Sequence, residues 1–274
     1  MTSDDTPGLT EMTEANRAAW DASEPLHRAG PDWQALLDRA RAGKFSTLDE
    51  TLTETLLGLS PGGKRVVQIG CNNGRELLSV AALGAVPALG IDHSRAFLDQ
   101  GEELAAAAGV SCQFLCADVY ALPEDTPSDF DIALVTIGVL GWMPDLARFL
   151  SATAGLLAPG GRLVMYETHP FLEMFDPRAE DPFSPRTSYF AEGPDIGDEA
   201  ITYDGPTEAK AGVSYWFVHR MGDIVTACVE AGLVIDHLSE HPHSNREADF
   251  DVYCDRDAQL PMCFTLVATK AARR

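Results

Sequence analysis

The chain has 274 residues, of which 45% are apolar, so it is long enough and apolar enough for one large α/β domain with additions. Its formal net charge of -22 argues against a nucleic-acid partner, because neutralising a phosphate backbone takes clustered Lys and Arg. The N-terminus is acidic, and no run of about eighteen apolar residues occurs. We therefore expect no signal peptide, no membrane partner, a cytoplasmic location, a small-molecule substrate, and a monomer or homodimer.

Three helices are expected ahead of residue 61. Residues 11–20 have helical composition, residues 31–41 open with Pro-Asp, and a third helix is expected after Ser46, which would cap it. A Pro-Gly-Gly run at residues 61–63 ends that helix. We interpret residues 1–60 as an N-terminal helical cap on a core that spans residues 61–274.

The core begins with a β-branched strand and a tight turn at residues 65–78, RVVQIGCNNGRELL. The first five residues are typical of a buried parallel strand, and Gly70 and Gly74 allow backbone angles that other residues avoid. Such a turn leaves backbone N–H groups free for a small polar ligand over the strand end. A dinucleotide fingerprint starting at Gly70 needs glycines where the chain has Asn72 and Arg75, so NAD is disfavoured.

Strand and helix patterns then alternate along the chain. Further strands are predicted at residues 86–91, 113–116, 130–136, 162–168, 233–238 and 262–268, and one of the intervening helices at residues 95–108. A polar loop without a helical pattern joins the last two strands, so we expect them to pair antiparallel at the edge of the sheet.

Two carboxylates follow predicted strands of this sheet. Asp92 closes the second strand, 22 positions beyond Gly70, where it can accept hydrogen bonds from both ribose hydroxyls of a nucleoside cofactor. The alternative is that Asp92 only caps the next helix, for which Ser94 is already adequate. Asp118 follows the third strand, and the alternative there is a surface turn.

Residues 68–74, QIGCNNG, resemble motif I of the class I S-adenosylmethionine-dependent methyltransferases, and residues 130–170 resemble motifs IV to VI. The resemblance implies a doubly wound, mostly parallel, seven-stranded Rossmann-like sheet with an antiparallel last strand. It also implies S-adenosylmethionine as cofactor and S-adenosylhomocysteine as product. The sequence departs from the family pattern at Gln68, where a carboxylate is usual, and at Asn72, where a glycine is usual.

The resemblance further implies cofactor contacts. Asp118 would accept a hydrogen bond from the adenine amino group, and the N–H of Val119 would donate to the ring. Residues 16–21, NRAAWD, resemble a segment that closes over the methionine end, although a helix that merely packs Trp20 against the domain is an equal alternative. The expected cofactor-binding residues are Gln68, Gly70, Cys71, Asn72, Asn73, Gly74, Asp92, His93, Asp118, Val119, Thr136, Ile137 and Trp20.

Residues 170–212 interrupt the alternation with six prolines, ten carboxylates and six aromatic residues. A long insertion at the carboxyl edge of a parallel sheet is typical of an active-site lid, and a disordered linker would seldom hold so many aromatics. We expect this lid to cover the substrate and to be mobile when the site is empty. The expected substrate-binding residues are Trp142, Phe175, Tyr189, Tyr203, Tyr215 and Trp216.

Methyl transfer needs alignment and exclusion of water more than a fixed catalytic group. The candidates are His169, Glu167 and His241, with His219 and His243 as further histidines. His169 is favoured because its strand end is expected to face the crevice and imidazole titrates near neutrality, although it could simply end a strand. No third ligand accompanies His241 and His243 at a characteristic spacing, so no metal is expected.

The six cysteines form no CxxC pair and are expected to be reduced, mostly buried thiols. As a whole, the sequence predicts methyl transfer from S-adenosylmethionine to the oxygen or nitrogen of a small organic molecule, such as a secondary metabolite. Two alternatives stay open because Gln68 and Asn72 alter the methionine end of the site. The chain could use the same cofactor for a cyclisation or rearrangement, or it could bind the cofactor without catalysis.

Overall fold

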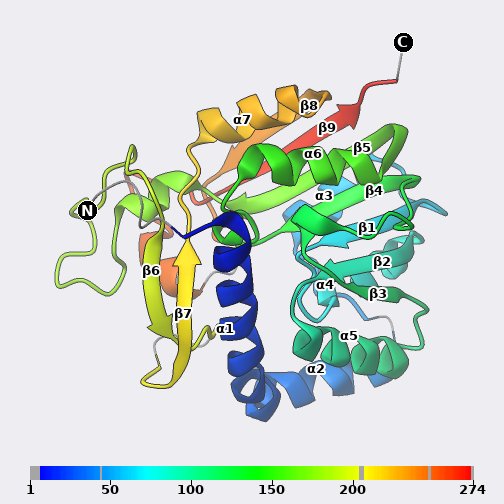
Figure 1. Cartoon of the computed structure of the whole chain (residues 1–274), viewed down its shortest axis with the longest axis horizontal. Helices are drawn as coiled ribbons and strands as arrows, with labels where there is room; N and C mark the ends of the chain where they lie inside the picture. Colours follow the sequence, from blue (N-terminus) through cyan, green and yellow to red (C-terminus); the bar gives the residue numbers. More distant parts are fainter. Residues whose placement is uncertain (1–6, 44, 204–206, 246–247, 273–274) are drawn as a thin grey trace.

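A seven-stranded sheet forms the centre of the computed structural model, which describes residues 7–43, 45–203, 207–245 and 248–272 (Figure 1). The strands lie in the order β3-β2-β1-β4-β5-β9-β8. They are β1 (Arg65–Ile69), β2 (Val86–Asp92), β3 (Gln113–Cys116), β4 (Phe130–Thr136), β5 (Leu157–Thr168), β8 (Leu233–His241) and β9 (Cys263–Lys270). The first five are parallel, and β9 is antiparallel to both β5 and β8. The predicted seven-stranded sheet with an antiparallel last strand is confirmed.

Helices cover both faces of this sheet, because successive residues of its buried strands point to opposite sides. Val67 packs with Phe149 and Ile224 on one face, whereas Val66 packs with Leu52 and Leu77 on the other. These partners come from α6 and α7 on the first face and from α3 and α4 on the second. The helices are α1 (Leu9–Ala29), α2 (Pro31–Arg41), α3 (Glu50–Gly58), α4 (Arg75–Ser79), α5 (Arg95–Ala108), α6 (Leu146–Leu156) and α7 (Met221–Glu230).

Several predicted boundaries coincide with the observed ones, and others differ. Helix α1 runs from Leu9 to Ala29 instead of over the predicted residues 11–20, and β8 ends at His241 instead of residue 238. The third helix begins at Glu50, and its cap is Asp49, whose side chain accepts a hydrogen bond from the N–H of Leu52 at 2.8 Å. The expectation that Ser46 caps this helix was therefore wrong. Strand β5 begins earlier than predicted, because Leu157 already pairs with Phe130 of β4.

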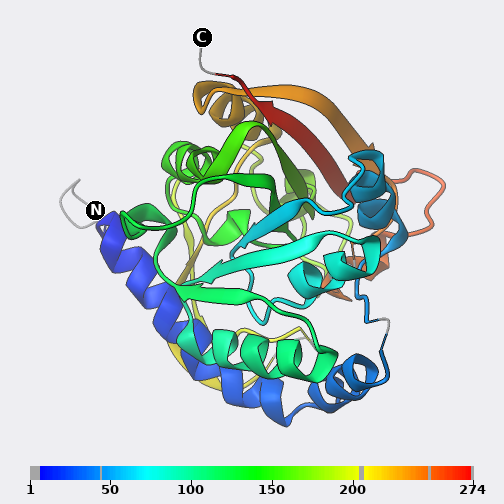
Figure 2. The ribbon, with the colours of Figure 1, turned by 90° about the vertical axis from the view of Figure 1, so that its right-hand side faces the viewer.

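The three N-terminal helices have different neighbours. The third, α3, packs onto the sheet, α2 packs against α5 (Figure 2), and α1 lies beside β7 (Lys210–Trp216) (Figure 1). The division of the chain into a cap and a core at residue 60 stays a prediction.

The segment predicted as a lid is tied to α1 by polar contacts. It contains the short helix η4 (Pro170–Met174) and strand β6 (Asp195–Glu199), which pairs antiparallel with β7. The amide of Asn16 donates to the carbonyl of Tyr215 at 2.9 Å and accepts from its N–H at 2.7 Å. The N–H of Ile201 donates to Ser23 at 2.9 Å. Helix α1 and this segment therefore form a continuous layer over one edge of the sheet.

Candidate active site

A cavity of about 830 Å³ opens at the carboxyl ends of the parallel strands. Residues that follow β1, β2, β3 and β4 line its base, and residues of α1 and of the 170–212 segment line its roof. Ligands of open α/β sheets bind at this edge, and the volume lies in the upper part of the range of about 300–1,000 Å³ for small-molecule sites. The cavity is therefore large enough for a cofactor and a second small molecule.

The turn after β1 has the backbone that its glycines and asparagines predict. Gly70, Asn72 and Gly74 all adopt positive φ, at 64°, 51° and 67°. A Cβ on Gly70 would lie 2.9 Å from Val139 of the loop after β4, so only glycine fits there. The N–H of Asn72 donates to Asp92 Oδ2 at 2.7 Å, which links the turn to the end of β2.

Eight of the expected cofactor-binding residues line the cavity. They are Trp20, Gly70, Asn72, Asp92, His93, Asp118, Val119 and Ile137. The other five, Gln68, Cys71, Asn73, Gly74 and Thr136, lie outside its lining, and their contacts with the cofactor stay predictions. Gly74 instead caps α4, where a Cβ would meet Phe114 at 2.8 Å.

Gln68 is buried and donates to Thr136 Oγ1 at 2.8 Å. Its Oε1 atom has no hydrogen-bond partner among the described residues. Turning the amide round would exchange the two atoms and still leave one unpaired. A buried amide atom without a partner is costly, so this position can still offer a hydrogen bond to a polar ligand group at the turn.

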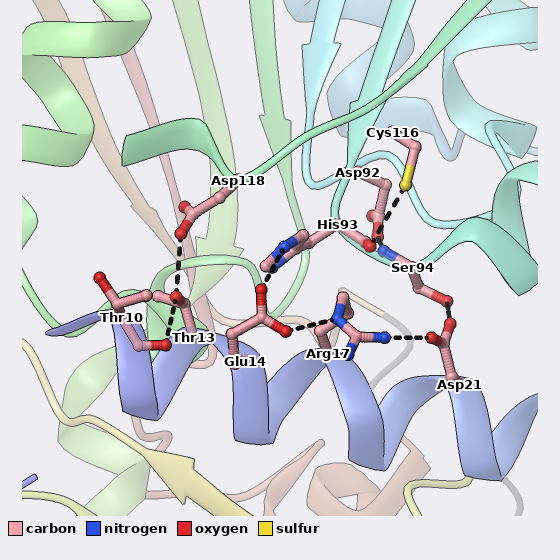
Figure 3. A network of polar contacts seen from close by, with 10 residues as sticks. All are labelled: Thr10, Thr13, Glu14, Arg17, Asp21, Asp92, His93, Ser94, Cys116 and Asp118. Carbon is pink, nitrogen blue, oxygen red and sulfur yellow. Dashed lines mark hydrogen bonds and ion pairs between the residues drawn. The ribbon is translucent and has the colours of Figure 1, made fainter. Parts of the chain in front are cut away.

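Helix α1 brings a row of polar side chains over the ends of β2 and β3 (Figure 3). Thr13 Oγ1 donates to Asp118 Oδ2 at 2.9 Å, and Ser94 Oγ donates to Asp21 Oδ1 at 2.5 Å. Arg17 lies between them and pairs with Asp21 at 2.8 Å. Thr13 and Arg17 line the cavity but were missed as site residues. Their spacing on one helical face, in register with Trp20, is the signal that could have found them.

The carboxylate of Asp92 is held at the centre of this arrangement. Its two oxygens accept the N–H groups of Asn72, at 2.7 Å, and Ser94, at 2.9 Å. Burial raises the pKa of Asp92, and these backbone donors act in the opposite direction. Each oxygen keeps further acceptor capacity, because a carboxylate has about four lone-pair sites. Asp92 can therefore accept two ligand hydroxyl groups as well.

Aromatic side chains from separate parts of the chain form one wall of the cavity. The rings of Trp20 and Trp142 lie 5.4 Å apart, and those of Trp142 and Trp216 lie 5.0 Å apart, both edge to face. A Cβ on Gly141 would approach the Trp216 ring to 2.3 Å, so this glycine permits the contact. Phe175 and Tyr203 also line the cavity.

Two of the expected substrate-binding residues lie elsewhere. The hydroxyl of Tyr189 accepts the N–H of Met221 at 2.9 Å, at the start of α7. Tyr215 is 8% exposed, and its backbone pairs with Asn16 of α1. Neither lines the cavity, so the structure gives no support for their expected contact with the substrate, which stays a prediction.

Among the three catalytic candidates, Glu167 alone lines the cavity. It is 3% exposed and accepts the N–H groups of Gly138, Val139 and Leu140 at 2.5, 3.0 and 3.2 Å. These contacts hold the loop after β4, where Ile137 has a φ of 29°. Glu167 therefore positions the loop that carries Trp142 and faces Gly70.

The two histidines of that set have partners outside the cavity. His169 accepts the N–H of Phe171 at 3.1 Å and contacts Glu240 of β8 at 2.8 Å, and His241 bonds to Thr265 of β9. The expectation that His169 faces the crevice was wrong. His219 does line the cavity, with Nε2 2.8 Å from the carbonyl oxygen of Met143.

We expect the free energy of unfolding to fall as the pH is lowered from about 7.5 to 5.5. Burial lowers the pKa values of His169, His219 and His241 below the usual 6.5. Between these lowered values and 6.5 the unfolded chain binds more protons than the folded chain, so stability is full above 6.5 and is lost below it. Urea unfolding at three pH values measures the slope. Replacing both His169 and His219 by glutamine should flatten it, and an unchanged slope would contradict this assignment.

The described side chains include no group of three or more His, Cys, Asp or Glu residues arranged to hold a metal ion. The six cysteines are free thiols; Cys71, Cys228 and Cys263 are buried, and Cys116 is exposed. Within the described residues no helix is long and apolar enough to cross a membrane.

Comparison with known proteins identifies the part of the chain that forms this site. Residues 66–161 match the model of a methyltransferase domain family. A ubiquinone biosynthesis O-methyltransferase of Methylococcus capsulatus is 32% identical over 102 residues, which are 37% of this chain and 42% of the relative. The 27-O-demethylrifamycin SV methyltransferase of Amycolatopsis mediterranei is 33% identical over 127 residues, 44% of this chain and 46% of the relative. The chain thus spans less than half the length of these curated relatives.

A solved structure extends the likeness over more of the chain. The S-adenosylmethionine-dependent methyltransferase of Mesorhizobium loti superposes with a TM-score of 0.57 and 25% sequence identity, over 79% of this chain and 96% of that one. The matched residues 66–161 include β1 from Val66 onward, β2 to β4 and the turn after β1. Residues 66–161 therefore form a methyltransferase domain, and the chain around them is similar to the S-adenosylmethionine-dependent methyltransferases of class I.

Proposed function

We propose that the protein binds S-adenosylmethionine in this cavity and transfers its methyl group to the oxygen or nitrogen of a small organic molecule. The observation that carries the proposal is the convergence of Gly70, Asp92 and Asp118 from three neighbouring strand ends on one cavity. Asp92 would accept the ribose hydroxyls, and Asp118 would accept the adenine amino group. The turn at Gly70, with Gln68 beneath it and Trp20 above, would hold the methionine end.

When bound, the cofactor supplies an activated methyl group on a positively charged sulfur. The chain then has three tasks, which are to align the acceptor, to exclude water and to take up a proton where the acceptor carries one. The aromatic wall of Trp20, Trp142 and Trp216 supports the first two tasks. His219 supports the third, because it lines the cavity and burial lowers its pKa, so that the imidazole is neutral near pH 7.

The class of acceptor follows from charge and size. The net charge of -22 disfavours nucleic acid as the acceptor, and a cavity of about 830 Å³ suits a small molecule beside the cofactor. The role of residues 170–212 as a substrate cover belongs to this proposal, and its support is that Phe175 and Tyr203 line the cavity. A place in secondary metabolism and a cytoplasmic location stay predictions.

We expect the purified chain to bind S-adenosylhomocysteine with a dissociation constant in the micromolar range and to give no response to NAD. The reason is the spacing of the turn, in which Asn72 and Arg75 stand where a dinucleotide fingerprint needs glycine. Titration calorimetry with both ligands measures this. Binding of NAD without binding of the sulfur nucleoside would remove the proposal.

A second candidate function has support from one position. Gln68 stands where the family usually has a carboxylate, and its amide bonds to Thr136 instead of lining the cavity. This favours a protein that binds the cofactor and catalyses a cyclisation or rearrangement, or none at all. Transfer of a labelled methyl group to any member of an acceptor panel would exclude it, whereas tight cofactor binding without such transfer would favour it.

A further inference from the structure

Arg186 differs from the other cations of this acidic chain. The sequence has 42 acidic and 20 basic residues, so a guanidinium normally finds a carboxylate nearby. Within residues 7–43, 45–203, 207–245 and 248–272, Arg186 is the Lys or Arg side chain for which no ion pair, hydrogen bond or ring contact is found. By contrast, Arg220 pairs with Asp223, and Arg256 lies over the ring of Phe183. Arg186 is exposed and lines the cavity.

The backbone fixes the position of Arg186 beside η4. The N–H groups of Arg186 and Thr187 both donate to the carbonyl of Met174, at 2.7 and 3.2 Å. Since η4 directly follows β5, this pair of contacts places Arg186 at the β5 side of the cavity. Thr187 lines the cavity next to it and adds a hydroxyl group.

The strand order separates this side of the cavity from the proposed nucleoside contacts. Three strand spacings lie between β2 and β5, and four lie between β3 and β5. At about 4.8 Å for each spacing, these are distances of about 14 and 19 Å. Asp92 and Asp118 therefore lie at one end of the cavity and Arg186 at the other, where the methyl acceptor would enter.

The cavity is also lined by aromatic rings and by the carboxylates of Glu173, Asp176 and Asp195. Phe175, Trp216 and Phe250 are among these rings. Glu173 accepts the indole N–H of Trp216 at 3.3 Å, and Asp176 accepts the N–H of Arg178 at 2.9 Å. A guanidinium offers a planar fork of donors that matches a carboxylate or a phosphate.

We propose that Arg186 binds an anionic group, a carboxylate or a phosphate, on a ring-bearing methyl acceptor whose apolar body packs against Trp142 and Trp216. This inference rests on the proposed function, because it assigns the acceptor to the half of the cavity that the cofactor leaves open. It makes Arg186 a determinant of acceptor specificity. It gives Arg186 no part in holding the cofactor.

Titration of the full chain with matched phenolic probes tests this. The probes are 4-hydroxybenzoate, its neutral amide 4-hydroxybenzamide, and phenyl phosphate, each added with and without S-adenosylhomocysteine. Tryptophan fluorescence reports binding, because three indoles, those of Trp20, Trp142 and Trp216, form the aromatic wall. We expect the wild-type chain to bind at least one anionic probe about tenfold more tightly than the amide, as for a charge-assisted pair at a partly exposed site. The stronger of the two anions identifies the preferred group.

Three variants test whether the guanidinium of Arg186 itself causes the preference for the anionic probe. Arg186→Ala should reduce the preference for the anion to less than about twofold, and Arg186→Lys should keep part of it. The matched control is Arg41→Ala, which removes an exposed guanidinium of α2 that pairs with Asp38 outside the cavity. This control should behave like the wild-type chain. In every variant the affinity for S-adenosylhomocysteine should stay within about twofold.

Three results of the probe titrations would overturn the inference. They are equal binding of anion and amide by the wild-type chain, the same preference in Arg186→Ala, and failure of all three probes to bind. A loss of S-adenosylhomocysteine affinity in Arg186→Ala would overturn it too, because the guanidinium would then serve the cofactor. Failure of the wild-type chain to bind S-adenosylhomocysteine is a separate result, which would remove the proposed function while the probe titrations still report on Arg186.

Discussion

Replacement of Asp92 by alanine is expected to weaken the binding of S-adenosylhomocysteine about a hundredfold, which corresponds to about 3 kcal/mol. Two losses add. The variant lacks the proposed acceptor for the ribose hydroxyls, and it frees the N–H of Asn72, which fixes the turn at Gly70. Titration calorimetry of wild type and variant at one ionic strength measures the difference.

Two controls accompany this experiment. Asp92→Asn keeps the shape and one acceptor oxygen, so it should lose less affinity than the alanine variant. Asp129→Ala removes an exposed carboxylate that pairs with Arg65 outside the cavity, and it should bind as the wild type does. Wild-type affinity in a folded Asp92→Ala protein would show that the ribose does not lie at the end of β2.

The second large effect is expected at Glu167. Replacing it by alanine should lower the free energy of unfolding by about 3 kcal/mol, because three backbone N–H groups lose their acceptor and cavity water replaces only part of it. The released loop carries Val139 and Trp142, so methyl transfer should also be lost. Urea unfolding followed by tryptophan fluorescence measures the first effect, and transfer of a labelled methyl group measures the second.

The variant Glu167→Gln shows whether Glu167 positions the loop after β4 or transfers a proton. In Glu167→Gln the amide oxygen still accepts one or two of the N–H groups, so stability and turnover should both recover in part. Glu124→Ala, which removes an exposed glutamate of a loop, controls for the charge change. If Glu167→Ala keeps wild-type stability and loses only turnover, Glu167 acts on the substrate and not on the loop.

The sequence predicted those parts of the fold that depend on local patterns. The bounds of α2, α5, β3 and β4 coincide with the predicted ones, because glycine, proline or serine stands at or near the ends of these elements. Strand β6 was not predicted. Its five residues, DIGDE, are all exposed and become a strand only by pairing with β7.

The candidate site, like the fold, has residues that local patterns predicted and residues whose positions depend on distant parts of the chain. Asp92 and Asp118 were correctly expected in one cavity, because the carboxyl ends of parallel strands meet at one edge of the sheet. The position of His169 could not be predicted, because it depends on Glu240, which lies 71 residues away and reaches it only when β8 joins the sheet through β9. The role of Glu167 likewise depends on N–H groups 27 to 29 residues away.

The contacts between α1 and the segment around β7 have a consequence for the order in which the molecule assembles during synthesis. Asn16 is made 199 residues before Tyr215, with whose backbone groups it pairs. Ser23, which accepts the N–H of Ile201, is made 178 residues before it. The separations within the parallel part of the sheet are smaller, because β1 pairs with β2 across about 21 residues and with β4 across about 66. Helix α1 therefore cannot make these contacts until β7 has been made, and the roof of the cavity closes only after the five parallel strands have left the ribosome.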